Sequence, residues 1–272
     1  MRIGAHLWIG KGLESCLELA VKLNCQCLQI FLHNPRQWQI KRRSDLELVN
    51  FRRELKKAKI FPLFVHMPYL LNLSSSEKRV RQLSLRRLSQ ELEEAETIGA
   101  FGYIIHPRNH QKISSGEETS LLAWALALFS DVKVIPLLEN TATRGNWWSL
   151  WSPVKKSFSW VRFCLDTAHA WAAGYDLRSR DGFQLMLKDI EKNVGLRYIS
   201  LIHANGSKVT CGSGLDRHES LNRGTFGLRI FQWLGSHKQL RNRPFIIETP
   251  RRGLAEDREN MALLRKIGEK HA

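Results

Sequence analysis

Short apolar runs alternate with longer amphipathic segments along the whole chain. Eight of the short runs have the length and residue types of buried strands: 2–8, 27–32, 61–67, 103–107, 134–140, 161–167, 198–204 and 244–249. The helical spacing of apolar positions predicts the intervening helices: 13–23, 44–58, 76–98, 117–129, 181–193, 224–236 and 254–269. The connection at 141–160 has room for only a short helix.

Alternating strands and helices are typical of parallel βαβ units, in which each helix crosses over a parallel sheet. Eight such units close a TIM (β/α)8 barrel, and 272 residues is an ordinary length for that fold. Seven or nine units would fit the pattern nearly as well. We therefore predict an α/β fold, a TIM barrel in which residues 1–272 form a single domain. The active site of such a barrel lies at the C-terminal ends of the strands.

Six of the eight predicted strands, the third through the eighth, end in a side chain that can bind a metal. These residues are His66, His106, Glu139, Asp166, His203 and Glu248. In a barrel these side chains would meet in one concave site. Three imidazoles and three carboxylates would there repel one another and lose hydration unless bound cations held them. The pattern therefore predicts bound divalent metal. Mixed histidine and carboxylate ligation favours Zn²⁺, with Mn²⁺ or Fe²⁺ as alternatives.

A further trio of potential ligands lies in two later segments. His169 follows Asp166 by three residues, in a stretch that we expect to be extended or turning. Asp216 and His218 are two residues apart in the loop GLDRHESLNRG, so in an extended loop both side chains point the same way. Together with His169 they supply two histidines and one carboxylate, a set typical of an open catalytic zinc site.

The remaining ligands divide into two groups if one carboxylate is shared. Glu139 is central in strand order and could join a site made with His66 and His106 to a second site. The second site would use three residues: Asp166, His203 and Glu248. Three metals suit displacement at phosphorus, because cations activate water and stabilise the leaving oxyanion.

The charge balance indicates the class of partner. The chain has 42 Lys and Arg against 26 Asp and Glu, a net charge of +16. Such an excess favours polyanions, nucleic acid first and an acidic membrane surface second, although a basic surface can also serve solubility alone. No apolar run approaches the roughly 20 residues that a membrane helix needs. The N-terminus is a poor signal peptide, so we expect a cytoplasmic protein, associated with the nucleoid through DNA.

The cysteines have no spacing typical of disulfides. There are five, Cys16, Cys25, Cys27, Cys164 and Cys211. Cys25 and Cys27 resemble a metal-binding pair but lie where a strand should begin. We expect reduced and mostly buried thiols.

Several segments together resemble the endonuclease IV family of DNA-repair enzymes. They include NPRQW at 34–38, HMPYLLNL at 66–73, ENTA at 139–142, LDTAHAWAAGYDLR at 165–178 and DRHESL at 216–221. The resemblance covers nearly the whole chain. All nine ligand positions of the family carry the expected type of residue here.

The resemblance implies a TIM barrel with three Zn²⁺ that cleaves duplex DNA on the 5′ side of abasic sites. The products would be a 3′-hydroxyl and a 5′-deoxyribose phosphate. It implies that Glu139 bridges two zincs and that Glu248 helps to position the attacking hydroxide. It also implies that Arg36, Tyr69 and Leu70 enter the DNA and flip the abasic nucleotide out, which is cheapest where no base pairs or stacks. We expect a monomer.

Some positions depart from the family pattern. Gly206 stands where Asp is common, Arg223 stands where Glu is common, and Arg108 replaces a small residue. The connection at 141–160 is short. These changes leave all nine ligands in place, so they bear on rate and substrate preference more than on reaction type.

Two other functions fit the same sequence. A metal-dependent sugar isomerase or epimerase uses the same barrel with one or two metals, and a catalytically weakened DNA-binding homologue would keep the fold and the charge. The third ligand trio and the net charge of +16 favour the nuclease, because an enzyme for small sugars needs neither.

Overall fold

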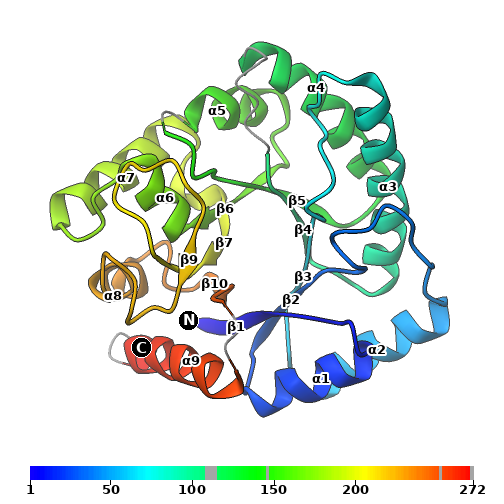
Figure 1. Cartoon of the computed structure of the whole chain (residues 1–272), viewed down its shortest axis with the longest axis horizontal. Helices are drawn as coiled ribbons and strands as arrows, with labels where there is room; N and C mark the ends of the chain where they lie inside the picture. Colours follow the sequence, from blue (N-terminus) through cyan, green and yellow to red (C-terminus); the bar gives the residue numbers. More distant parts are fainter. Residues whose placement is uncertain (108–114, 145–146, 251–252, 270–272) are drawn as a thin grey trace.

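The eight predicted strands are present and close into one parallel barrel (Figure 1). The computed structural model describes residues 1–107, 115–144, 147–250 and 253–269. The barrel strands are β1 (Arg2–Leu7), β2 (Cys27–Ile30), β3 (Leu63–His66), β4 (Gly102–Ile105), β5 (Ile135–Glu139), β6 (Arg162–Asp166), β7 (Ile199–His203) and β10 (Pro244–Ile247). Strand β1 pairs in parallel with both β2 and β10, which closes the sheet. The predicted TIM barrel is confirmed.

Helices surround the barrel on its outside (Figure 1). They are α1 (Leu13–Lys22), α2 (Asp45–Lys57), α3 (Lys78–Thr97), α4 (Ser115–Ala127), α5 (Trp148–Ser157), α6 (Thr167–Ala173), α7 (Arg180–Asn193), α8 (Arg229–Ser236) and α9 (Leu254–Glu269), with short 3-10 turns at Leu128–Asp131 and Leu196–Tyr198. The short helix expected in 141–160 is α5. Across the residues with a described position, no helix is both long and apolar enough to cross a membrane.

Local chemistry fixes several helix boundaries. The side chain of Ser44 accepts a hydrogen bond from the backbone of Glu47 and begins α2, and Ser179 does the same for α7 through Gly182. Helix α8 begins later than the predicted 224–236, because the backbone of Thr225 donates to the Ser207 carbonyl and holds that part of the chain in a loop.

Two apolar layers hold the barrel together. Inside it, side chains from seven strands form a small cluster made of Cys27, Phe64, Ile104, Leu137, Cys164, Leu201 and Ile246. A larger core fills the space between the strands and the helices. The interior is therefore a packed plug rather than a pore, as in other TIM barrels, and it supports the polar residues at the strand ends. None of the five cysteines, all of which lie in the described residues, forms a disulfide, and four of them are buried, as predicted.

Two elements near the strand ends were not expected. The stretch after Asp166 is not extended but forms α6, which begins because the Asp166 carboxylate accepts a hydrogen bond from the His169 backbone at 2.7 Å. A second small sheet pairs β8 (Gly206–Ser207) with β9 (His218–Glu219) in antiparallel fashion. This pairing ties the loop that carries His218 back to the end of β7.

The close approach of these two strands accounts for the glycine at position 206. A Cβ at Gly206 would lie 2.5 Å from the carbonyl oxygen of Ser220. The position therefore has no room for a side chain in this chain, and the glycine serves packing of the β8–β9 sheet.

Candidate active site

A cavity of about 780 Å³ opens at the carboxyl ends of the barrel strands. Seven of the nine predicted metal ligands line it: His66, His106, Glu139, His169, Asp216, His218 and Glu248. The other two, Asp166 and His203, are fully buried beneath it; Asp166 Oδ2 lies 3.6 Å from His218 Nε2, and His203 Nδ1 lies 2.7 Å from Glu139 Oε1. The structure therefore brings all nine side chains to one end of the barrel.

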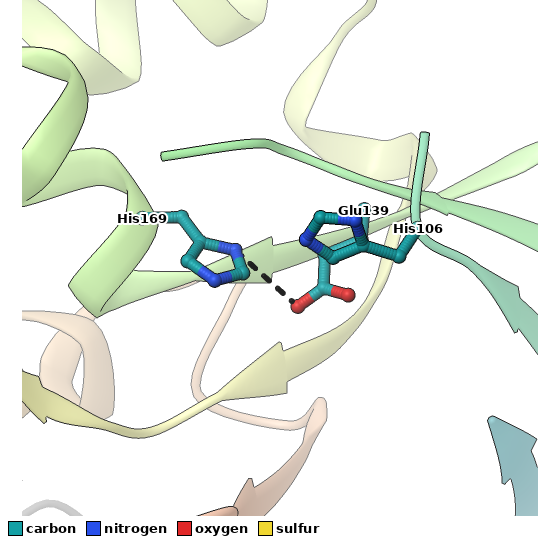
Figure 2. Close-up of side chains that lie close together, drawn as sticks. All are labelled: His106, Glu139 and His169. Atoms are coloured by element: carbon teal, nitrogen blue, oxygen red, sulfur yellow. Dashed lines mark ion pairs between the residues drawn. The ribbon is translucent and has the colours of Figure 1, made fainter. Parts of the chain in front are cut away.

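Glu139, at the end of β5, lies among four histidines. Its Oε2 atom is 3.4 Å from His66 Nε2, and its Oε1 atom is 2.7 Å from His203 Nδ1 and 3.6 Å from His169 Nδ1. Figure 2 shows the Glu139 carboxylate next to His106 and His169, with its ion pair to His169 as a dashed line. His106, Glu139 and His169 each offer one ligand atom, and these three atoms lie within 4.8 Å of one another. The two oxygens thus face different ligand groups, as a bridging carboxylate requires.

A second group lies deeper in the barrel, at the ends of β6, β7 and β10. The Nδ1 atom of His203 is 3.0 Å from Glu248 Oε2 and 3.9 Å from Asp166 Oδ2. With Glu139 these residues offer four ligand atoms that all lie within 4.8 Å of one another. Three carboxylates around one imidazole nitrogen form a strongly negative pocket.

The third group joins α6 to the β8–β9 loop. Asp216 places its two oxygens 3.3 Å from His169 Nε2 and 3.2 Å from His218 Nε2. The same His218 nitrogen is 3.6 Å from Asp166 Oδ2. Asp216 is 51% exposed, so this group forms the open side of the site.

The opposite nitrogen of each of four ligand rings is held by an oxygen atom. The Nδ1 of His66 donates to the Met67 carbonyl at 2.8 Å, and that of His169 donates to the Asn140 carbonyl at 2.8 Å. The His218 Nδ1 lies 3.4 Å from the carbonyl of Glu248, and His203 Nε2 lies 2.8 Å from Gln29 Oε1. Such bonds fix the tautomer of a metal-binding histidine and aim its other nitrogen at the ion.

The electrostatics of the ion-free site follow from burial and from the mutual proximity of these groups. Burial alone would raise the pKa of Glu139 and of Glu248, but His203 and the other imidazoles hold both well below their ordinary value. Burial lowers the pKa of His169, yet the surrounding carboxylates outweigh it and raise the pKa to about 10. The carboxylates therefore attract positive charge into the cluster, which protons or metal ions can supply.

Two buried ligand atoms fit metal ions better than protons. His106 Nε2 and Glu139 Oε2 are buried, and neither has a hydrogen bond to any residue that the structure describes. Burial and neighbouring histidines lower the pKa of His106, which keeps its imidazole neutral. A neutral imidazole and an ionised carboxylate are the forms that bind zinc. The donor set thus fits divalent cations.

Three amide side chains position the ligands, and sequence reasoning missed them. Gln29 donates to Glu248 and accepts from His203. Asn205 donates to Asp166 Oδ2 at 2.6 Å and accepts from the Glu248 backbone, and Asn140 pairs with the backbone of Asp166 at 2.7 and 3.0 Å. The feature of the sequence that could have identified these three amides is a polar residue inside or directly after an apolar strand.

The other residues singled out from the sequence lie as follows. Arg36 and Tyr69 are exposed and line the cavity, whereas Leu70 is partly exposed and is not among the lining residues. Arg223 does not line the cavity and lies 3.5 Å from Glu256 on α9. Arg108 falls outside the described residues.

Comparison with known proteins gives matches along nearly the full chain. The family described as xylose isomerase-like TIM barrel matches residues 17–267. The probable endonuclease 4 of Halothermothrix orenii is 36% identical, over 98% of this chain and 100% of that protein. The probable endonuclease 4 of Aquifex aeolicus is 34% identical, over 97% of this chain and 96% of that protein.

Solved structures agree with the sequence matches. Endonuclease IV from Thermus thermophilus matches with a TM-score of 0.87 and 30% identity, over 99% of this chain and 100% of that chain. A D-tagatose 3-epimerase-like protein matches with a TM-score of 0.72 but only 16% identity, so it shares the fold alone. The matches to endonuclease 4 proteins over almost their entire length show that this chain belongs to the endonuclease IV family of xylose isomerase-like TIM barrels.

Proposed function

We propose that the protein is a metal-dependent endonuclease that cleaves duplex DNA on the 5′ side of abasic sites. The observation that carries the proposal is the convergence of nine histidines and carboxylates, in three groups, at the end of a barrel of the endonuclease IV family. Hydrolysis at that position leaves a 3′-hydroxyl and a 5′-deoxyribose phosphate. The net charge of +16 suits a polyanionic substrate.

Three Zn²⁺ fit the three groups, with Mn²⁺ or Fe²⁺ as alternatives in one or more of them. His66 and His106 with Glu139 would hold one, and His169, Asp216 and His218 a second. Asp166, His203 and Glu248 would hold the third, together with the other oxygen of Glu139. When bound, the ions supply an activated water nucleophile and stabilisation of the negative charge that develops on the phosphoryl and leaving oxygens.

Two carboxylates act directly on the reaction. Glu248 is ionised and is held by His6 at 2.9 Å and by Gln29 and Asn205. It accepts a hydrogen bond from the attacking water and orients that water toward phosphorus. Glu139 is ionised too and keeps its two oxygens directed at different ligand groups, which fixes the spacing between them.

Recognition of the lesion uses the rim of the cavity. Arg36, Tyr69 and Leu70 would enter the DNA and displace the abasic nucleotide into the cavity. The cavity volume of about 780 Å³ has room for a nucleotide. A site without a base loses no pairing or stacking when it is flipped, which favours damaged DNA. One chain supplies all nine proposed ligands, so the site needs no residue from a second subunit, and we propose that the protein acts as a monomer.

The alternatives account for less of the site. A sugar isomerase or epimerase on this barrel needs no third ligand group on the β8–β9 loop and no large positive charge. A weakened homologue that only binds DNA needs none of the nine ligands.

The proposal is tested with a duplex oligonucleotide that carries one abasic analogue and with an undamaged control. We expect a single cut 5′ to the lesion and a 3′ end that a DNA polymerase extends. Cutting of the undamaged duplex at the same rate, or a 3′ end that carries phosphate, would contradict it.

A further inference from the structure

A half-exposed tryptophan on the rim of the cavity has no part in the reaction described above. Trp8 directly follows β1, is 47% exposed and lines the 780 Å³ cavity. Tryptophan offers a large flat surface and has few rotatable bonds, so little entropy is lost when a ligand packs on it.

The main chain holds this indole in place. A Cβ on Gly10 would lie 1.8 Å from Trp8 Nε1 and 2.4 Å from Trp8 Cε2, so the ring packs directly on the Gly10 backbone. The φ angle of Gly10 is not in the left-handed region. The close approach of the ring, rather than backbone freedom, therefore requires glycine here, and Gly10→Ala displaces the ring without straining the backbone.

The surroundings of Trp8 combine aromatic rings with cations. His6, two residues earlier in the chain, packs on Phe31 with the two rings tilted by 49° and their centroids 4.4 Å apart, and Phe31 contacts Tyr69 at 5.2 Å between centroids. Trp8 and Tyr69 are the exposed aromatic rings among the lining residues. Three cations line the same cavity: Arg36, Lys208 and Arg217.

We propose that Trp8 is a stacking platform for a nucleobase of the bound DNA. Nucleic-acid grooves combine cations for the phosphates with rings for the bases, which is the combination found here. Inside an intact duplex both faces of each base are already stacked. Stacking on the Trp8 ring therefore adds most binding free energy at the base face that the missing base leaves uncovered. The ligand of this subsite is thus the intact nucleobase next to the abasic position. This inference rests on the proposed function and adds a substrate contact to it.

The test compares Trp8→Ala with the wild type on duplexes that carry an abasic analogue next to 2-aminopurine. Stacking on one base changes affinity by roughly tenfold, within the range found for such contacts. We expect KM to rise about tenfold while kcat stays within about twofold, because the ring binds substrate and transition state alike. The wild type should also quench 2-aminopurine emission more strongly than Trp8→Ala does.

Three further variants separate stacking from a general effect on the fold. Trp8→Phe should recover most of the lost affinity, and Gly10→Ala should weaken binding in the same direction as Trp8→Ala. Trp124→Ala removes a ring that is 72% exposed on α4 and does not line the cavity, so it should match the wild type.

The results that overturn the proposal are distinct from failure of the proposed function. A wild-type KM and wild-type quenching in Trp8→Ala would overturn it, and so would a fall in kcat with unchanged KM. A wild-type protein that binds the lesion duplex but does not cut it would contradict the proposed function alone, because quenching still reports on stacking by Trp8.

Discussion

His169 and His218 direct their Nε2 atoms at each other across 3.4 Å, although the Nδ1 atoms of both rings already face backbone carbonyls. Two neutral imidazoles oriented in this way have lone pairs face to face, which is unfavourable without a positive charge between them. Asp216 contacts both nitrogens and adds a negative charge at the same point. The arrangement is the one expected of three ligands around a cation.

The first prediction concerns this group. His218→Ala should remove one metal per chain and lower the rate of incision by about 100-fold, because a ligand of the metal proposed to bind His169, Asp216 and His218 is lost. Metal content is measured by elemental analysis and incision by gel assay, with circular dichroism to verify the fold. His237→Ala alters a histidine outside the cavity and is the matched control. An unchanged metal count in His218→Ala would remove this residue from the site.

The second prediction concerns a residue that positions ligands. Gln29 connects His203, His6 and Glu248 through its amide. Gln29→Leu has a similar volume but no polar atoms, so metal affinity or activity should fall by about 10- to 100-fold. Competition with a fluorescent zinc chelator measures the affinity. Equal affinity in the variant and the wild type would show that the ligands hold their orientation without the amide.

The third prediction concerns the loop that carries Arg36. Arg87 on α3 is buried, donates to the Trp38 carbonyl at 3.0 Å and pairs with Glu91 at 2.8 Å. Arg87→Met leaves the Glu91 carboxylate buried without its cation, which should cost about 3 kcal/mol of unfolding free energy. It should also raise KM, because the loop loses its anchor.

Urea unfolding and steady-state kinetics check both parts of that prediction. The double variant Arg87→Met with Glu91→Gln should recover stability, because no buried charge is left unpaired, but it should not recover KM. Restoration of both quantities would show that the loop does not depend on Arg87.

The fourth prediction concerns pH and applies to the metal-free protein. The pKa of His169 is raised to about 10, so the folded form holds a proton there that the unfolded chain loses near pH 6.5. This contribution to stability is fully present below pH 6.5 and is lost as the pH rises toward 10. At pH 7 a metal must displace that proton, since zinc binds neutral imidazole. Calorimetric titration with zinc in buffers of different ionisation enthalpy should therefore reveal that protons are released on binding. If the wild type released no proton, the raised pKa of His169 would be contradicted.

The fifth prediction concerns the DNA interface. If phosphate contacts dominate binding, affinity for duplex DNA should fall by about 10³- to 10⁵-fold between roughly 50 and 200 mM salt, as for a protein that makes about 6–10 such contacts. Fluorescence anisotropy with a catalytically inactive variant measures the slope. Binding that is insensitive to salt would show that the positive charge serves another purpose.

The sequence was sufficient to predict the barrel because each strand is a short apolar run, and six of the eight runs end in a polar residue. Helix α6 escaped prediction because residues 167–172 are all buried, so no polar face gives them a helical period. Strands β8 and β9 are only two residues long and depend on pairing between distant segments. Likewise, the contacts of Gln29 and Asn205 arise only when the barrel closes, since their partners lie far away in the chain.

The most direct test of the account is incision of a duplex that carries one abasic site, by protein that has been stripped of metal with a chelator and then reloaded with zinc. We predict cutting 5′ to the lesion by the untreated protein, loss of cutting after prolonged chelation and recovery on addition of zinc. Cutting that persists after the metal content has fallen to zero would contradict the central claim that the nine converging ligands work through bound metal.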